Sequence, residues 1–228
     1  MRVLTWNLYH GRAVPPAGRD LQDEFAAALA DWAWDVALLQ EVPPWWATAL
    51  ARACGADART APTSRNELPA LRRAVADRWP DLVKSGGGGS NVILVRRASG
   101  RITDHRRVRL RRWPERRVCH GVALDNGLWC ANLHAQVHSA ARARADIARA
   151  AAATLGWAHG RPAVLGGDFN VPNPAAPGFE HLGGHGVDHV LGHLVEADGP
   201  AQVLDHGRLS DHAPVVVPVL ARHDRAAG

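Results

Sequence analysis

The segment AVLGGDFN at residues 163–170 constrains the fold more than any other part of this 228-residue chain. An apolar run reaches a glycine pair and then presents Asp168 and Asn170, which an extended chain places on the same side. Because Gly, Asp and Asn are also common turn residues, the segment alone is equally compatible with an ordinary strand-to-loop turn. The alternative is a buried strand that ends in a polar, reactive edge.

Three further segments combine an apolar run with a polar edge. Asn7 ends the first apolar run in TWN, and Glu41 ends the second in LLQE. Asp211 and His212 in LSDH precede the last apolar run, residues 213–220. Oxygen ligands suit a hard divalent cation such as Mg²⁺ or Mn²⁺, whereas structural zinc would require closely spaced Cys and His. The pattern therefore predicts a divalent metal site that acts on a phosphate.

The segments TWN, LLQE, NLH, GDFN, VDH and SDH, in this order, resemble the endonuclease/exonuclease/phosphatase superfamily. That superfamily contains pancreatic-type deoxyribonucleases, abasic-site endonucleases, sphingomyelinases and inositol-polyphosphate phosphatases. Alternating strands and helices indicate an α/β protein. The resemblance implies a four-layer α/β/β/α sandwich: two packed mixed, largely antiparallel sheets with outer helices and the active site at one end. We expect one domain over residues 1–221 and a disordered tail over 222–228.

The resemblance implies a metal-binding role for three residues. Glu41 would be the main ligand, although a solvated Glu at a strand end is the simpler alternative. Asn7 would position the metal or bind the phosphate, and Asp211 would support the metal and its water. Some relatives carry an acidic residue two positions after this Asn, where the present chain has Tyr9. A site with one metal is therefore more consistent with the sequence than a site with two.

The resemblance also implies how water attacks the phosphate. Asp168 would orient or deprotonate the water, and Asn170 would donate a hydrogen bond to a phosphoryl oxygen of the transition state. His212 would contact the scissile phosphate or transfer a proton, with Asp188 orienting its ring and raising its pKa. His134 would assist protonation of the leaving group, and a core or turn histidine is its alternative interpretation.

Arginine is concentrated in one part of the chain, whose net charge is +5. The residues are Arg96, Arg97, Arg101, Arg106, Arg107, Arg109, Arg111, Arg112, Arg116 and Arg117. One interpretation is a solvated edge strand that charge protects from aggregation. The other is a substrate-binding surface in which Arg107, Arg109 and Arg111 share one face of a regular strand and bind phosphates. This second interpretation favours DNA or RNA, with inositol phosphates or lipid headgroups as alternatives.

Hydropathy and cysteine usage indicate a cytoplasmic protein. No apolar run approaches the roughly 20 residues of a membrane span. The first strand begins at Val3, which leaves no room for a secretory leader, and no obligate protein partner is evident. A two-residue turn at 126–127 places Cys130 opposite Ala123 and Cys119 near His134, too far apart for a disulfide. We expect Cys54, Cys119 and Cys130 to be reduced.

Periodicity predicts the surrounding elements. Helices are expected from Asp20, within residues 45–53, over 68–79, and over 139–158 with a stripe of Ala148, Ala151, Ala152 and Leu155. Strands are expected over 35–42, 91–96, 102–112, 187–191 and in a hairpin over 118–133. The segment SGGGGS at 85–90 resembles a flexible linker, and we interpret it as a mobile surface loop or an engineered replacement.

Histidines recur every four residues at His181, His185, His189 and His193, which a helix would stack into a zinc site. Three nearby glycines oppose a helix, so we expect loop and surface histidines instead. A non-catalytic nucleic-acid or phospholipid binding module on the same fold is the competing functional class. Loss of a catalytic residue would indicate such a module, and every matched position is present.

Overall fold

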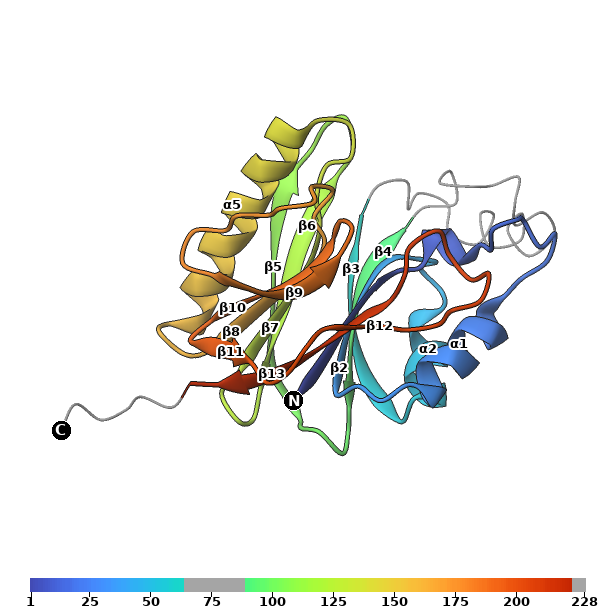
Figure 1. Ribbon diagram of the computed structural model, residues 1–228, viewed down its shortest axis with the longest axis horizontal. Helices are drawn as coiled ribbons and strands as arrows, with labels where there is room; N and C mark the ends of the chain where they lie inside the picture. Colours follow the sequence, from blue (N-terminus) through green and yellow to red (C-terminus); the bar gives the residue numbers. More distant parts are fainter. Residues whose placement is uncertain (64–88, 223–228) are drawn as a thin grey trace.

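Two mixed β-sheets pack face to face, and helices cover their outer surfaces (Figure 1). The computed structural model describes residues 1–63 and 89–222. Helix α5 (Ala140–Ala158) lies on one flank, and α1 (Gln22–Asp31) and α2 (Ala47–Ala53) lie on the other. This arrangement is the α/β/β/α sandwich that the family resemblance implies. No helix among the described residues has the length and hydropathy to cross a membrane.

The first sheet has the strand order β11-β13-β1-β2-β4-β3, with β12 paired to β13. Strands β1 and β2 run parallel, and the other neighbouring strands run antiparallel. Its strands are β1 (Arg2–Asn7), β2 (Val36–Val42), β3 (Ala56–Pro62), β4 (Ser90–Arg96), β11 (Val195–Ala197), β12 (Gln202–Val203) and β13 (Val215–Ala221).

The second sheet has the strand order β5-β6-β7-β8-β10-β9. Only β7 and β8 run parallel among its pairs. Its strands are β5 (Ile102–Arg111), β6 (Arg117–Leu124), β7 (Trp129–His134), β8 (Ala163–Asp168), β9 (Glu180–His185) and β10 (Asp188–His193). In each sheet the parallel pair is central. The carboxyl ends of its two strands therefore lie at the same edge of the sandwich.

The glycine pair before Asp168 is required by close packing on both faces of β8. A Cβ atom on Gly166 would lie 2.6 Å from Leu38 Cδ1, inside the core between the sheets. Gly167 has a φ of +140°, and a Cβ there would overlap the carbonyl oxygen of Leu133 on β7. Glycine alone tolerates both the close approach and this backbone conformation. The pair therefore lets β8 deliver Asp168 between its neighbouring strands.

The hairpin of β6 and β7 is shifted by one residue from the predicted register. The N–H of Leu124 donates to the carbonyl of Leu128 (2.9 Å) across a loop that ends at Gly127, whose φ is +87°. A loop with a left-handed glycine at its third position replaces the two-residue turn assumed from the sequence. Cys130 consequently lies opposite Val122, not Ala123. All three cysteines are nevertheless free and buried, as expected.

Helix α5 packs through a different stripe from the one predicted. Its start is as expected, because the Ser139 hydroxyl accepts a hydrogen bond from the backbone N–H of Arg142. Ala148 and Ala152 are exposed, although Ala151 is buried. The buried residues are Ala143, Asp146, Ile147, Ala150, Ala151, Thr154 and Ala158. Alanine fits both buried and exposed positions, so its spacing alone does not identify the packed face.

Arg111 does not share a face with Arg107 and Arg109, contrary to the prediction. The pairing of β5 with β6 shifts between Arg109 and Arg111, which turns Arg111 toward α5. Its Nη2 lies 3.0 Å from Oδ1 of the fully buried Asp146 and donates to the carbonyl of Arg142. A buried carboxylate requires such a partner. Arg111 thus joins α5 to the sheet, whereas Arg107 and Arg109 are exposed.

The four regularly spaced histidines lie on strands β9 and β10, so the expectation that they do not share a helix is confirmed. The expectation of loop and surface positions is wrong for His189, which is buried and lies 3.0 Å from His181 between ring nitrogens. The predicted helix at 68–79 lies outside the described residues. The same holds for residues 85–88 of the glycine-rich segment and for residues 223–228 of the predicted tail.

Candidate active site

The predicted catalytic residues gather at one end of the sandwich. Asn7, His134 and Asp168 are the last residues of β1, β7 and β8. Asp188 begins β10 directly opposite Asp168 in the antiparallel pairing. His212 lies in the connection between β12 and β13. The sequence motifs therefore converge because neighbouring strands end at a common edge.

Asp168 is the centre of this cluster. Its Oδ2 accepts a hydrogen bond from Asn7 Nδ2 (3.0 Å) and lies 3.4 Å from Nε2 of His134. The same oxygen lies 3.9 Å from Nε2 of His212, and Oδ1 accepts from the backbone N–H of Asn170 (2.9 Å). Burial raises the pKa of Asp168, while the charge of His212 and these hydrogen bonds act in the opposite direction. The carboxylate is thus fixed in position by its neighbours.

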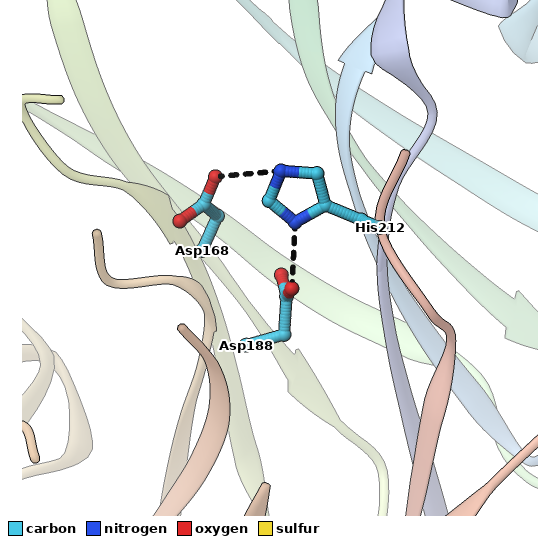
Figure 2. Close-up of side chains that lie close together, drawn as sticks. All are labelled: Asp168, Asp188 and His212. Atoms are coloured by element: carbon cyan, nitrogen blue, oxygen red, sulfur yellow. Dashed lines mark hydrogen bonds and ion pairs between the residues drawn. The ribbon is translucent and has the colours of Figure 1, made fainter. Parts of the chain in front are cut away.

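His212 lies between two carboxylates, as Figure 2 shows. Its Nδ1 is 2.7 Å from Asp188 Oδ2, while Nε2 faces Asp168. Burial alone would lower the pKa of His212, but the hydrogen bond to Asp188 and the nearby carboxylates raise it to about 9. Burial raises the pKa of Asp188 to about 6, against the effect of the His212 hydrogen bond. At neutral pH this arrangement favours a charged imidazolium paired with carboxylate.

A tight bend before β13 brings His212 and Asp211 to the site together. Ser210 has a φ of +65°, and its hydroxyl donates to the carbonyl of Asn7 (2.6 Å). The same hydroxyl accepts from the backbone N–H of His212 (3.1 Å), and Trp6 Nε1 donates to the His212 carbonyl (2.9 Å). Asp211 Oδ1 lies 4.0 Å from His212 Nε2. Neither Ser210 nor Trp6 was assigned a role from the sequence, although both lie within the motifs.

Glu41 has a left-handed backbone, with a φ of +51°, at an irregularity in the pairing of β2 with β4. Such irregularities re-aim side chains beside active sites. Its Oε2 lies 3.1 Å from His10 Nε2, and its Oε1 lies 3.9 Å from His134 Nδ1. Burial is the main reason that the pKa of Glu41 rises to about 7, with a further contribution from Asp168.

Two residues of the site escaped the sequence analysis. His10 lies in the 3₁₀ turn η1 (Tyr9–Gly11) with a φ of +55°, which directs it to Glu41. Arg117, only 6% exposed, donates to Glu115 (2.6 Å), while its Nε has no hydrogen-bond partner among the described residues. Its charge counteracts the raised pKa of Glu41. Nothing in the sequence separates Arg117 from the surrounding arginines, and none of the recognised motifs includes His10.

His134 differs from His212 in charge. Burial, followed by the positive charges of Arg117 and His212, lowers the pKa of His134 well below its ordinary value. A neutral His134 is suited to hydrogen bonding between Glu41 and Asp168. The charged His212 is the better source of a proton or of positive charge at a phosphate oxygen.

Polar contacts join the two sheets beneath the site. Gln40 Nε2 donates to Asn132 Oδ1 (2.8 Å), and Asn132 Nδ2 donates to the carbonyl of Leu39 (2.9 Å). Asn170, with a φ of +52°, is oriented by donation from Nδ2 to the carbonyl of Ala135 (3.0 Å). These bonds fix β2 against β7 and hold the amide of Asn170 at the edge of the cluster.

The donor atoms fit a hard divalent cation. Carboxylate oxygens of Glu41, Asp168 and Asp211, with the amide oxygen of Asn7, are ligands that Mg²⁺ and Mn²⁺ accept. Among the described residues, potential ligand atoms of Asp168, Asp188 and His212 lie within 4.8 Å of one another. Asp188 is already paired with His212, and Glu41 with His10, so a cation at this cluster would replace or share these existing contacts.

Solved structures share this fold at low sequence identity. A protein of unknown function from Enterococcus faecalis is 16% identical, with a TM-score of 0.69 and coverage of 97% of this chain and 100% of the other. A mannosyl-6-phosphatase from Bacteroides thetaiotaomicron is 16% identical, with a TM-score of 0.71 and coverage of 96% and 99%. The catalytic domain of human nocturnin, with bound sulfate, is 14% identical, with a TM-score of 0.66 and coverage of 96% and 93%.

No curated protein matches the chain in sequence. The family model described as Endonuclease/Exonuclease/phosphatase family matches residues 4–212, which include all the residues of the cluster described above. The chain belongs to the endonuclease/exonuclease/phosphatase family.

Proposed function

We propose that this protein hydrolyses a phosphodiester, most directly one in nucleic acid, by activating water with the help of Mg²⁺ or Mn²⁺. The observation that carries the proposal is the position of Asp168 between a neutral and a charged histidine at one end of the sandwich. A carboxylate for water and a cation for the phosphate are what attack on phosphorus requires. The family's phosphoesterase fold supports the same reaction class.

The metal would be held by Glu41, Asn7 and Asp211, the ligands that the family resemblance implies. When bound, it would neutralise charge on the phosphate and on the attacking water. Asn7 has a second role, because its Nδ2 donates to Asp168 and its Oδ1 accepts from the backbone N–H of Tyr9 (3.0 Å). These two bonds fix the amide plane of Asn7 and hold it against Asp168.

The remaining residues would act on the phosphate directly. Asp168 orients the water and accepts its proton, and the amide of Asn170 donates to a phosphoryl oxygen. Nε2 of His212 faces the same space and, being charged, stabilises the oxygens of the transition state or protonates the leaving group. Asp188 holds the other ring nitrogen and so fixes the direction of Nε2.

A substrate panel tests this function. We would assay supercoiled plasmid, abasic oligonucleotide, single-stranded RNA, bis-p-nitrophenyl phosphate, sphingomyelin and inositol polyphosphates, each with Mg²⁺ or Mn²⁺. Asp168→Asn serves as the matched inactive variant, which excludes a contaminating nuclease. We expect Asp168-dependent cleavage of nucleic acid. Cleavage of sphingomyelin or an inositol phosphate alone would instead support the alternative substrates, and no hydrolysis at all would support a binding module.

The exposed arginines of β5 provide a prediction about duplex binding. If Arg107 and Arg109 bind phosphates, changing both to Gln should reduce the slope of log K against log salt by about 0.9 for each phosphate that is no longer neutralised. Arg111 is left unchanged because it pairs with Asp146. Binding of the Asp168→Asn protein to a labelled duplex over a salt series measures the slope. Arg101→Gln, before β5 at the other end of the sheet, is the control, and an unchanged slope would show that β5 is only a solvated edge.

A further inference from the structure

The loop at residues 112–116 joins β5 to β6 and carries the most exposed large hydrophobic residue among those described. Trp113 is 75% exposed. It lies within the sequence RRWPERR, so arginines stand on both sides of the indole. Trp is highly buried on average, and its flat ring offers a large apolar face on which another flat group can stack.

Both ends of this loop are fixed. Arg111 is held against α5 by Asp146 and by the carbonyl of Arg142. Arg117 is buried and donates to Glu115. Trp113 therefore stands on a loop with an anchored base, although the indole itself is open to solvent.

The loop also lies beside the candidate active site. Arg117 is the first residue of β6, and Cys119 pairs with Leu133, which precedes His134 at the end of β7, so the loop leaves the sheet at the edge that carries the site. Trp113 precedes Arg117 by four residues, so their Cα atoms are at most about 14 Å apart even in a fully extended chain. A polymer whose phosphate occupies the site can place a neighbouring unit on the indole.

We propose that Trp113 is a stacking platform for an unpaired nucleobase next to the scissile phosphodiester, so that the substrate is single-stranded or locally unpaired nucleic acid. This inference rests on the proposed phosphodiesterase function. Bases in a duplex are already stacked, whereas an unpaired base offers a free face to an aromatic ring. The exposed Arg112 beside the indole supplies positive charge for the backbone.

Nucleic acid fits this loop better than a lipid surface does. Membrane-interface binding by aromatic residues depends on an extended apolar face that enters the bilayer. Here Trp113 is accompanied by Arg112, Pro114, Glu115 and Arg116, which present no such face. Stacking of one base with adjacent phosphate contacts requires only one ring and its cationic neighbours.

The test measures binding in the Asp168→Asn background, which prevents cleavage. Fluorescence anisotropy with labelled oligothymidylate should give a dissociation constant about 10-fold higher for Trp113→Ala, within the range for loss of one stacked base. Trp113→Phe should recover most of the affinity. An abasic strand of equal length should bind weakly and be insensitive to Trp113→Ala. Leu220→Ala, an exposed residue on β13, is the control for loss of surface apolar area and should match the parent.

Equal affinity of Trp113→Ala and the parent for oligothymidylate would overturn the proposal. An equal loss on the abasic strand would also overturn it, because the indole would then bind the backbone. A second measurement uses vesicles of phosphatidylglycerol and phosphatidylcholine. If Trp113→Ala weakened binding to the vesicles but not to the oligonucleotide, the loop would be a membrane-binding element and the proposal would be wrong. The binding assay does not depend on hydrolysis. If the protein hydrolysed no diester, the proposed function would be wrong, whereas Trp113-dependent binding of the oligonucleotide would still support the stacking proposal.

Discussion

Hydrolysis by this protein is expected to cease when EDTA removes divalent metal and to return when Mg²⁺ or Mn²⁺ is supplied in excess. The oxygen donors of Glu41, Asn7 and Asp211 suit these hard cations. Without the cation, the charge on the phosphate is left without its main counter-charge, and several kcal/mol of transition-state stabilisation disappear. Full activity in EDTA would contradict the mechanism at its first step.

Glu41→Gln tests whether Glu41 binds the metal. The change keeps the shape of the side chain but removes its charge, so the apparent affinity for Mn²⁺ should fall by about 10-fold to 100-fold or more. Titration calorimetry with Mn²⁺ measures that affinity directly, and activity against metal concentration gives a second value. Glu180→Gln, an exposed residue paired with Arg222, is the control. Superimposable metal titrations of Glu41→Gln and the parent would remove Glu41 from the ligand set.

The same residue gives the metal affinity a pH dependence. The pKa of Glu41 is raised to about 7, chiefly by burial. A carboxylate must be deprotonated to bind a metal, so affinity should weaken as the pH falls below about 7, where the buried side chain takes up a proton. In Glu41→Gln this part of the pH dependence should disappear.

The sandwich and most of the cluster were expected from the family resemblance, which rests on short local motifs. The GGDFN segment predicts a strand edge that carries Asp168, and the strand predicted over 187–191 carries Asp188. Pairing of β8 with β10 then places these two carboxylates opposite each other. The hydrogen bond between His212 and Asp188 was expected from the family resemblance, and the structure has it at 2.7 Å.

The features that could not be predicted from the sequence depend on tertiary contacts. Asp146 lies on the buried face of α5 because Arg111 neutralises it, a pairing that hydrophobic periodicity cannot detect. Arg117 and Arg112 are the same residue type in the same arginine-rich segment, yet Arg117 is buried near Glu41 and Arg112 is exposed to solvent. The register of the β6–β7 hairpin depends on how many residues its loop takes up, which Asn-Gly alone does not determine.

His212→Ala is expected to reduce kcat by about 100-fold or more, because it removes a positioned proton donor or positive charge at the phosphate. The backbone bonds from Ser210 and Trp6 to residue 212 do not depend on the side chain, so the bend should persist. Thermal unfolding followed by circular dichroism checks this. His193→Ala, at the far end of β10, is the control for loss of an imidazole. A kcat for His212→Ala equal to that of the parent would exclude the ring from the reaction.

Asp188→Asn tests the same histidine with its ring still in place, and it should reduce kcat less than His212→Ala does. In the parent, the hydrogen bond and charge of Asp188 outweigh the opposing effect of burial and raise the pKa of His212 to about 9. Without that carboxylate the pKa must fall, so His212 loses its proton at a lower pH. If charged His212 is the active form, the alkaline limb of the kcat profile moves to lower pH in Asp188→Asn, and the NMR titration of the His212 ring moves with it. A role of Asp188 in folding alone would lower the unfolding temperature but leave the alkaline limb unmoved.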